Sequence, residues 1–426
     1  MHEKKILELF LRYKAICTDT RKIIPNAIYF ALKGANFNGN IFAKQALESG
    51  CSFAIVDEEE YILDHRFIFV KDVLTSLQRL SQNYRSQLDN IIVIGLTGSN
   101  GKTTTKELIR DVLRKKFNVF ATHGNLNNHI GVPLSLLAIK PIDDFAIIEM
   151  GANHVKEIEL LSAISQPDFG LITNIGKAHL EGFGGIEGVA KGKAELFDFL
   201  RSENKQAFVN IGLPWMKDLK IGLDCIEYKS LGGKYNIRIT QSTPTLSFSC
   251  LVENKKYSIA TNFTGEYNIH NLVAAMVIGL YFEVKPEDIF EALSNYLPEN
   301  SRSQITITEK NTLILDAYNA NPTSLENALI NLANMDGKKY FIIGDMLEMG
   351  EHSAKEHLYI LELIKKLNLE GIVVGEHFIE AAKGDVLSFE NNVSAKVFLQ
   401  EKRIKNHTIL IKGSRGIQLE KVIDIL

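Results

Sequence analysis

From Ile91 onward, the chain alternates short apolar runs with helix-forming stretches, and this alternation is the feature that most constrains its fold. The runs IIVIGL (91–96), FAIIEM (145–150) and FGLITNI (169–175) have the length and apolar content of buried strands. The helix-forming stretch KELIRDVLRKKF (106–117) follows the first of them. Such alternation is typical of βαβ units around a parallel sheet, so we predict an α/β fold.

The rest of the chain forms blocks on either side of this region. First come the short apolar runs AIYFAL, FAIVD and RFIFV, and then the amphipathic segment DVLTSLQRLSQNYRSQL, a predicted connector. The polar stretch NIRITQSTPTLSFSCLVENKKYSIA predicts an antiparallel excursion, and NIHNLVAAMVIGLYFEV predicts a helix that returns to the core. After LPENSRSQ, the strands TLILDA, YFIIGD, GIVVG and TILIKG predict a second, smaller doubly wound unit. We therefore predict three α/β domains, at residues 1–88, 89–301 and 302–426.

Composition narrows the kind of protein. The length of 426 residues suits about three domains of roughly 150 residues each. Lys and Arg total 48 against 51 Asp and Glu, so the charge gives no case for nucleic acid or an anionic membrane as the main partner. No apolar run approaches the roughly 18 residues of a spanning helix. The four cysteines are scattered without a Cys-x-x-Cys pair, as expected for reduced thiols in a cytoplasmic protein.

A glycine-containing loop lies between the first predicted strand and the first predicted helix of the central region. The longer phosphate-binding pattern needs a glycine where Leu96 stands, and the chain has the shorter form Gly98-x-x-Gly101-Lys102-Thr103. In such a strand–loop–helix, backbone N–H groups point at an anion. Lys102 would reach the β- and γ-phosphates, and the Thr103 hydroxyl would ligate Mg²⁺. The alternative, a tight turn with a solvated lysine, is disfavoured by the strand before the loop and the helix after it.

Polar side chains follow the ends of the next two predicted strands. Glu149 lies near the end of FAIIEM and Asn174 near the end of FGLITNI, and His179 follows shortly after in a glycine-rich segment. Because ligands bind beyond the carboxyl ends of parallel strands, Glu149 and His179 are expected at one edge with Thr103. Each alone is more often structural, but together beside a phosphate loop they favour an oxygen-rich Mg²⁺ site with one imidazole.

Further polar groups have both a structural and a functional interpretation. Lys191 and Lys193, taken as residues alone, are more often solvated surface lysines. The loop ATHGNLNNHIG offers amides and an imidazole to a polar substrate, or caps the helix near Pro133, with equal weight. In the third block, several residues stand at strand ends or at the hinge, facing a predicted cleft. This position favours a functional role for them. These are Arg302, Asp316, Lys412, Ser414 and Arg415.

Together these motifs resemble the Mur ligases, ATP-dependent enzymes that form amide bonds in peptidoglycan synthesis and have the same short phosphate loop. The segment CTDTRKIIPNAIYFALKGANFNGNIFAKQALESGC is similar to their N-terminal UDP-sugar domain. GNLNNHIGVPLSLL, IIEMGANHVKEI and ITNIGKAHLEGFGGIEGVAKGKAELF are similar to their central ATPase domain. DAYNANPTSLENAL, IIGDMLEMGEHSAKEH and LIKGSRGIQLE are similar to their C-terminal domain. The resemblance implies a central P-loop-type parallel sheet and a Rossmann-like C-terminal domain that closes on ATP and binds the amine substrate.

The resemblance also implies roles for individual residues. Lys102, His179, Lys193 and Arg302 correspond to catalytic residues, and Lys193 to a lysine that the family carries as a carbamate. The implied metal ligands are Thr103, Glu149, His179 and Lys193. Tyr267 stands where a histidine is often found, which puts the fine adenine contacts in doubt. The implied nucleotide-binding residues are Gly98, Ser99, Asn100, Gly101, Lys102, Thr103, Thr104, Asn268, Asn271, Arg302 and Asp316.

The strings YNANP and GDMLEMG are most similar to the family member that adds a dipeptide. They imply UDP-N-acetylmuramoyl-tripeptide and D-alanyl-D-alanine as substrates, ATP and Mg²⁺ as cofactors, and an acyl-phosphate intermediate. They further imply a cytoplasmic monomer with no nucleic-acid partner and no membrane insertion. No Asp-Asn-Pro-Arg string occurs, which counts against the ligase that adds the third peptide residue. That ligase, a folylpolyglutamate synthase and a non-catalytic nucleotide switch remain the alternatives.

Overall fold

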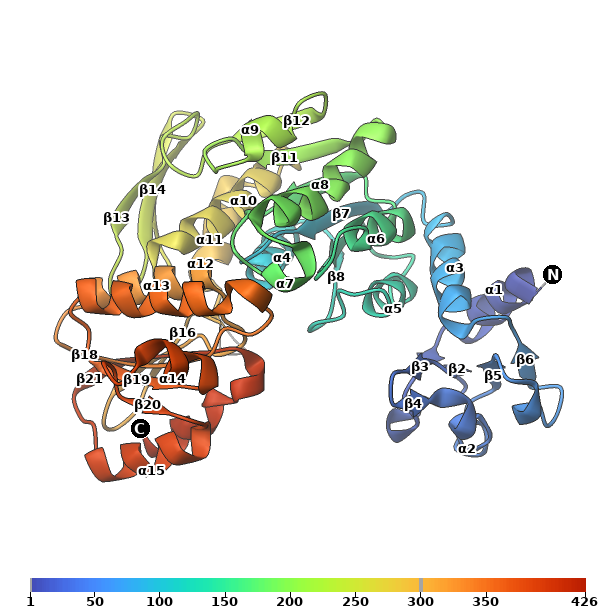
Figure 1. The fold of residues 1–426 in the computed structure, drawn as a ribbon. Coiled ribbons are helices and arrows are strands. Elements are labelled where there is room, and N and C mark those ends of the chain that lie inside the picture. The colour runs from blue at the N-terminus through green and yellow to red at the C-terminus, as the bar shows by residue number, and fades with distance from the viewer. Residues whose placement is uncertain (1, 299–301) are drawn as a thin grey trace.

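The computed structural model describes residues 2–298 and 302–426, which form three α/β domains (Figure 1). The N-terminal and C-terminal domains lie apart from each other, with the central domain between them. The expected α/β fold with parallel sheets is confirmed. The predicted boundary after residue 301 adjoins residues 299–301, which lie outside the described residues.

The N-terminal domain is built on a four-stranded parallel sheet with the order β1-β2-β5-β6. The apolar runs AIYFAL, FAIVD and RFIFV supply β2, β5 and β6, as predicted. Its strands are β1 (Ile16–Cys17), β2 (Ile28–Phe30), β3 (Lys33–Gly34), β4 (Phe37–Asn38), β5 (Phe53–Val56) and β6 (Phe67–Phe69). Its helices are α1 (His2–Tyr13) and α2 (Ala43–Glu48), and α3 (Val73–Arg85) is the predicted connector. Asp72 caps α3, which packs against α1, α5 and α6 and so joins the first domain to the second.

The central sheet contains six parallel strands in the order β12-β11-β10-β7-β9-β8. Its strands are β7 (Ile92–Thr97), β8 (Val119–Ala121), β9 (Phe145–Glu149), β10 (Phe169–Ile172), β11 (Gln206–Asn210) and β12 (Asp224–Tyr228). Its helices are α4 (Lys102–Leu113), α5 (Gly131–Leu137), α6 (Glu157–Ser165), α7 (Leu180–Phe183), α8 (Ile186–Ser202) and α9 (Met216–Leu219). Alternate residues of β7 are buried on opposite faces: Val93 packs with α6 and α8, and Ile94 with α4 and α10. Burial on both faces explains the continuous apolar runs of these strands.

The antiparallel excursion predicted from the polar stretch is confirmed. It consists of β13 (Arg238–Gln241), β14 (Ser247–Val252) and β15 (Lys255–Ala260), paired antiparallel in that order. The chain then returns through α10 (Ile269–Tyr281), whose side chains are buried over almost its whole length, and α11 (Pro286–Asn295). These two helices pack against α4 and complete one face of the central sheet.

The C-terminal domain has a six-stranded sheet in the order β16-β17-β21-β18-β19-β20, parallel except for β16. Its strands are β16 (Gln304–Ile307), β17 (Thr312–Leu315), β18 (Lys338–Gly344), β19 (Gly371–Val374), β20 (Ser388–Phe389) and β21 (His407–Lys412). Its helices are α12 (Pro322–Asn334), α13 (Ser353–Lys366), α14 (Glu376–Ala382) and α15 (Asn392–Lys402). Helices α12, α13 and α14 share a core with one face of the sheet, and α15 with the other, so the unit is doubly wound as predicted. In the part of the chain that the structure describes, no helix is long and apolar enough to cross a membrane.

Candidate active site

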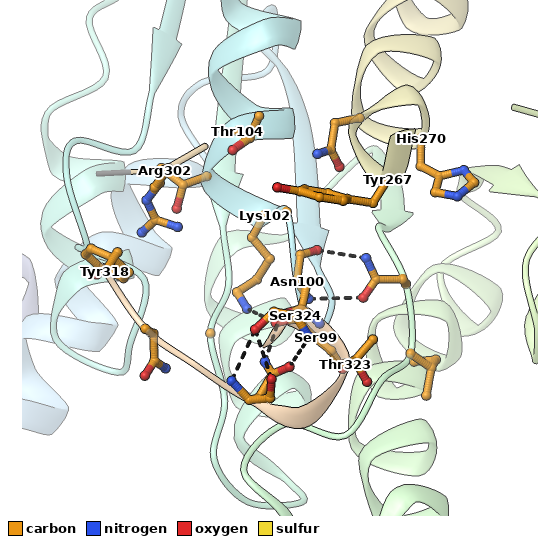
Figure 2. A pocket seen from close by; sticks show the side chains of 18 of the residues that line it. Ser99, Asn100, Lys102, Thr104, Tyr267, His270, Arg302, Tyr318, Thr323 and Ser324 are labelled. Carbon is orange, nitrogen blue, oxygen red and sulfur yellow. Dashed lines mark hydrogen bonds between the residues drawn. The ribbon is translucent and has the colours of Figure 1, made fainter. Parts of the chain in front are cut away.

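A cleft of about 910 Å³ lies where the central and C-terminal domains meet. Its walls include the loop after β7, residues that follow β9 and β10, and residues at the ends of β17 and β21. In Figure 2, Tyr267 and His270 lie on one side of Lys102, and Arg302 and Tyr318 on the other. The cleft thus lies at the carboxyl ends of parallel strands, where open α/β sheets bind their ligands.

The loop between β7 and α4 has the backbone of a phosphate site. Gly101, which precedes the first residue of α4, has a φ of 78°, and Gly98 has a φ of 144°. A Cβ atom on Gly98 would lie 2.0 Å from Thr173 Oγ1. The Lys102 ammonium donates to the carbonyl oxygen of Gly98 at 2.7 Å, and burial lowers the pKa of Lys102. A phosphate in this loop would therefore meet backbone N–H groups, the helix N-terminus and an ammonium group.

Thr103 and Glu149 meet at the edge of the central sheet, as predicted. Glu149 Oε1 accepts hydrogen bonds from Thr103 Oγ1 (3.2 Å) and Asn127 Nδ2 (2.8 Å). The side chain is 1% exposed, and its Oε2 atom has no hydrogen-bond partner, although Lys106 Nζ lies 3.6 Å away. A buried carboxylate oxygen beside a hydroxyl fits the oxygen ligands that Mg²⁺ prefers.

The other two predicted metal ligands are His179 and Lys193, and each has partners of its own. His179 lines the cleft, and its Nδ1 atom lies 2.6 Å from Glu348 Oε2 of the C-terminal domain. Within residues 2–298 and 302–426, no group of three or more His, Cys, Asp or Glu side chains is arranged to hold a metal ion. Mg²⁺ characteristically binds through one or two carboxylates, waters and substrate phosphates, so a protein cage is not required.

Lys193 is fully buried on α8, whereas Lys191, two residues earlier, is exposed. Its Nζ atom donates to the carbonyl oxygen of Ala152 (3.0 Å) and lies 5.0 Å from the centroid of the Phe183 ring. Burial, followed by the nearby charge of Lys102, holds the pKa of Lys193 well below its ordinary value. Ala152 itself lines the cleft, so Lys193 lies directly behind the cleft wall.

The residues predicted on the adenine side form one hydrogen-bonded group. Asn271 Oδ1 accepts from Thr105 Oγ1 (3.0 Å), and Asn271 Nδ2 donates to Asn268 Oδ1 (2.9 Å). A Cβ atom on Gly101 would lie 2.5 Å from Asn271 Oδ1, so this group also supports the phosphate loop. The Tyr267 hydroxyl lies 3.1 Å from Ser303 Oγ, and burial raises the pKa of Tyr267.

The C-terminal wall of the cleft carries the remaining predicted residues. The Arg302 guanidinium lies 3.6 Å from the centroid of the Tyr318 ring, with Arg415 at 5.9 Å from the same centroid. Asp316 Oδ2 accepts from Lys412 Nζ at 2.6 Å. Arg302, Asp316 and Lys412 all line the cleft, so the structure brings them to the same cleft as the phosphate loop.

The amide loop before α5 has both of the roles that its sequence allowed. Asn128 Oδ1 accepts from the backbone N–H groups of Ile130 and Gly131 at the start of α5, which is the capping role. Asn127 donates to Glu149, which is the site role.

Sequence reasoning predicted Asn100 as a nucleotide-binding residue but missed Asn321 and the contact between the two, which joins the two walls. Asn321 Nδ2 donates to Asn100 Oδ1 at 2.8 Å, across the domain boundary. Asn100 is also paired with Asn174 through two hydrogen bonds of 3.0 Å. The Asn-Pro-x-Ser pattern at 321–324 signals the helix start that fixes Asn321, but its partner in the central domain is a tertiary contact.

Fold and site together define a class: a nucleotide-dependent enzyme whose phosphate loop faces a second doubly wound domain across a cleft. The Mur ligase middle domain matches residues 96–279, and the glutamate ligase domain of Mur ligases matches residues 301–415. The chain belongs to the Mur ligase family, as its motifs predicted.

Individual relatives match over nearly their whole length. The UDP-N-acetylmuramoyl-tripeptide–D-alanyl-D-alanine ligase of Bacillus subtilis (strain 168) is 33% identical over 427 residues, which cover 96% of this chain and 92% of the relative. The enzyme of the same name from Escherichia coli (strain K12) is also 33% identical, covering 97% and 93%. A crystal structure of MurF from Acinetobacter baumannii superimposes with a TM-score of 0.87 at 31% identity, covering 97% of this chain and 93% of that one.

Proposed function

We propose that this protein is an ATP-dependent ligase that joins D-alanyl-D-alanine to UDP-N-acetylmuramoyl-tripeptide, forming ADP and phosphate during peptidoglycan precursor synthesis. The observation that carries the proposal is the cleft, in which the Lys102–Thr103 loop and the buried Glu149 face a second domain. The substrates are proposed from the nearly full-length similarity to ligases of this name.

ATP would place its phosphates in the loop of Gly98 to Thr104 and its adenine towards Asn268 and Asn271. Lys102 would exchange its bonds to loop carbonyls for bonds to phosphate oxygens. Arg302 and Asp316, on the C-terminal wall, would close over the nucleotide and exclude water, which would otherwise hydrolyse the acyl phosphate.

Thr103 and Glu149 are the residues that fit a Mg²⁺ ion, and His179 is proposed as a further ligand. When bound, the ion would offset the charge on the transferred phosphoryl oxygens. Lys193 is proposed to react as a neutral amine with CO₂, forming an N–C bond and releasing one proton. The resulting carbamate anion would lie close to the Lys102 charge that disfavours the ammonium form.

The reaction that these residues would support has two steps. The terminal carboxylate of the tripeptide attacks the γ-phosphorus, the bond to the bridging oxygen breaks, and ADP leaves. The amine of D-alanyl-D-alanine then attacks the acyl carbon of the acyl phosphate, and phosphate leaves after the amine loses a proton. Lys102 and Arg302 stabilise negative charge on the phosphoryl group, where electrostatics supplies most of the catalysis.

The N-terminal domain is proposed to hold the UDP moiety, with the domain boundaries at residues 88/89 and 301/302. We also propose that the enzyme acts as a cytoplasmic monomer without a nucleic-acid partner or membrane insertion. Helix α3 packs against α1 of the first domain and against α5 and α6 of the second, in one apolar core. This shared core would hold the UDP site at a fixed position relative to the cleft.

The test is mass spectrometry of the products formed from ATP, UDP-N-acetylmuramoyl-tripeptide and candidate amines. We expect amide formation with D-alanyl-D-alanine and little with free diaminopimelate or lysine. Coupling of a single diamino acid to the corresponding UDP-N-acetylmuramoyl-dipeptide, with no turnover of the tripeptide, would instead indicate the ligase that adds the third residue. ATP binding without substrate-dependent ADP release would indicate a non-catalytic nucleotide switch.

A further inference from the structure

The segment that follows β10 is held by the C-terminal domain at several points. The backbone N–H of Lys177 donates to Thr323 Oγ1 (3.0 Å), and its ammonium pairs with Glu356 at 2.7 Å. The backbone N–H of Glu181 donates to the carbonyl oxygen of Glu348 (3.1 Å). Among these interdomain contacts, only the Glu348 carboxylate touches a proposed metal ligand, at 2.6 Å from His179 Nδ1.

The loop that presents Glu348 is built to hold one conformation. Asp345, at its start, accepts from the backbone N–H groups of His377 and Phe378 at the beginning of α14. The next residues are fixed by donation from Met346 N to His357 Nε2 (3.1 Å) and from Leu347 N to Ser414 Oγ (2.9 Å).

The side chains on either side of Glu348 anchor it further. Met346 and Met349 are buried, and Glu348 has a φ of 62°. Gly350, with a φ of 52°, lies against Glu181, where an added Cβ would approach the Glu181 side chain to 3.1 Å. The string GDMLEMG is therefore a rigid loop that turns one carboxylate towards the central domain.

We propose that Glu348 is a positioning residue that orients the His179 imidazole towards the cleft from across the domain interface. A carboxylate that accepts from Nδ1 leaves the Nε2 atom free to act as a ligand, an arrangement that is common around metal-binding histidines. His179 directly precedes the short helix α7 with a φ of 53°, and within the described residues its side chain makes no capping hydrogen bond to that helix, so Glu348 is placed to orient the ring.

The inference rests on the metal-binding role proposed above for His179 and adds a dependence on domain position. Because Glu348 belongs to the C-terminal domain, the ring is oriented only while the two domains are docked. Assembly of the metal site and closure of the cleft are then one event, which prevents phosphoryl transfer in the open, water-filled state.

The test measures how tightly Mn²⁺, used in place of Mg²⁺, binds to the full-length enzyme in the presence of ADP. Electron paramagnetic resonance reports the concentration of the free ion. Glu348→Ala should weaken binding about ten-fold or more, and Glu348→Gln, which keeps an acceptor oxygen, should weaken it less. Glu356→Ala is the matched control, since it removes an interdomain carboxylate that does not touch His179; we expect unchanged Mn²⁺ binding. Glu348 is 48% exposed on its side chain, so unfolding of the apo variant should stay close to that of the unaltered protein.

His179→Ala separates this inference from the function on which it rests. If Glu348 acts through His179, adding Glu348→Ala to His179→Ala should cause no further loss of Mn²⁺ binding. Normal binding in Glu348→Ala together with weak binding in His179→Ala overturns the inference and leaves the proposed metal ligand in place. Equal losses of Mn²⁺ binding in Glu348→Ala and Glu356→Ala also overturn the inference, because both carboxylates would then act only by holding the two domains together. Normal binding in His179→Ala removes the metal role itself.

Discussion

Two buried lysines lie on different helices of the central domain, and their surroundings differ in one respect. Lys106, on α4, is 1% exposed, and its Nζ atom lies 3.6 Å from Glu149 Oε2 and 3.9 Å from Glu107 Oε1. Lys193, on α8, is 0% exposed and contacts a carbonyl oxygen and an aromatic ring. Among the described residues, no carboxylate lies within 4 Å of its ammonium nitrogen.

This difference in surroundings predicts different roles for the two lysines, an electrostatic one for Lys106 and a chemical one for Lys193. Burial is the largest cause and lowers the pKa of both lysines. The next cause at Lys106 is the charge of Glu149, which raises the pKa, whereas the next cause at Lys193 is the charge of Lys102, which lowers it ahead of the opposing Glu157 and Glu195. Lys106 is therefore placed to neutralise Glu149, whereas Lys193 has no such partner among the described residues, which is consistent with the carbamate proposed for it. Burying a lysine without a counter-charge is costly, and the carbamate proposed for Lys193 would give a physical reason to keep a lysine there.

The largest expected effect concerns Lys102, whose charge also lowers the pKa of Lys193. Lys102→Ala should lower kcat about 10³-fold, because the ammonium group is the expected partner of the transferred phosphoryl group. The fold should remain, since among the described residues the Nζ atom bonds only to carbonyl oxygens of its own loop. Steady-state kinetics and urea unfolding of the apo variant measure the two properties. Loss of cooperative unfolding would show that Lys102 is a structural residue.

The second prediction compares the two buried lysines, Lys106 and Lys193, by substituting each. Lys106→Met should lower the free energy of unfolding by about 3 kcal/mol, because Glu149 would remain buried without its counter-charge. Lys193→Met should leave the stability equal or higher, since it removes a buried amine that has no carboxylate partner. Urea unfolding in CO₂-depleted buffer measures both. Equal losses would contradict the distinction between the two lysines.

This stability difference should depend on pH in a defined direction. Between the lowered pKa of folded Lys193 and the ordinary value of 10.5, the unfolded chain binds a proton that the native state does not. The Lys193 contribution to stability therefore falls as pH falls through this range. The advantage of Lys193→Met over the unaltered protein should be greater at pH 7 than at pH 10, and a constant advantage would argue against a lowered pKa.

The third prediction tests the chemistry at Lys193. Lys193→Ala should lower activity about 10- to 100-fold, the range seen when groups that support a metal site are lost. Added formate or acetate should restore part of the activity by supplying the missing anion. Full activity of Lys193→Ala in CO₂-depleted buffer would disprove the carbamate proposal.

The smallest effect is expected at Lys191, which is the control for Lys193 on the same helix. Lys191 is exposed, and surface substitutions away from special features usually change stability by less than about 0.5 kcal/mol. Lys191→Ala should keep activity within about two-fold of the unaltered protein in the same assay. A loss equal to that of Lys193→Ala would show that α8 responds to any lost positive charge.

Most of the fold was predictable because its strands are buried on both faces. Continuous apolar runs located β7, β9, β10, β17, β18, β19 and β21, and the polar stretch located the antiparallel strands. Strand order was beyond the sequence pattern. The edge strand β16, for example, pairs antiparallel with β17, and its residues Gln304–Ile307 carry no signal of that direction.

The site was predictable where one local segment makes it, as in the phosphate loop and Glu149. It was not predictable where two distant segments meet. The carboxylate of Glu348 lies 169 positions from His179, and Asn321 lies 221 positions from Asn100. Lys193 shows the same limit, because lysines are usually exposed to solvent and this one is buried beside Phe183 and the Ala152 carbonyl, which belong to other segments.

The neighbours of the phosphate loop also restrict how its sequence can evolve. Gly98 is enclosed by Thr173 of the segment after β10, and Gly101 by Asn271 of α10, each at a distance that leaves no space for a Cβ atom. Both glycines also have backbone angles that other residues rarely adopt. A substitution at either position would need a compensating change on another element and a different backbone path at once. Two simultaneous changes are rarely reached by single mutational steps, so both glycines should persist in descendants of this chain even where the surrounding surface diverges.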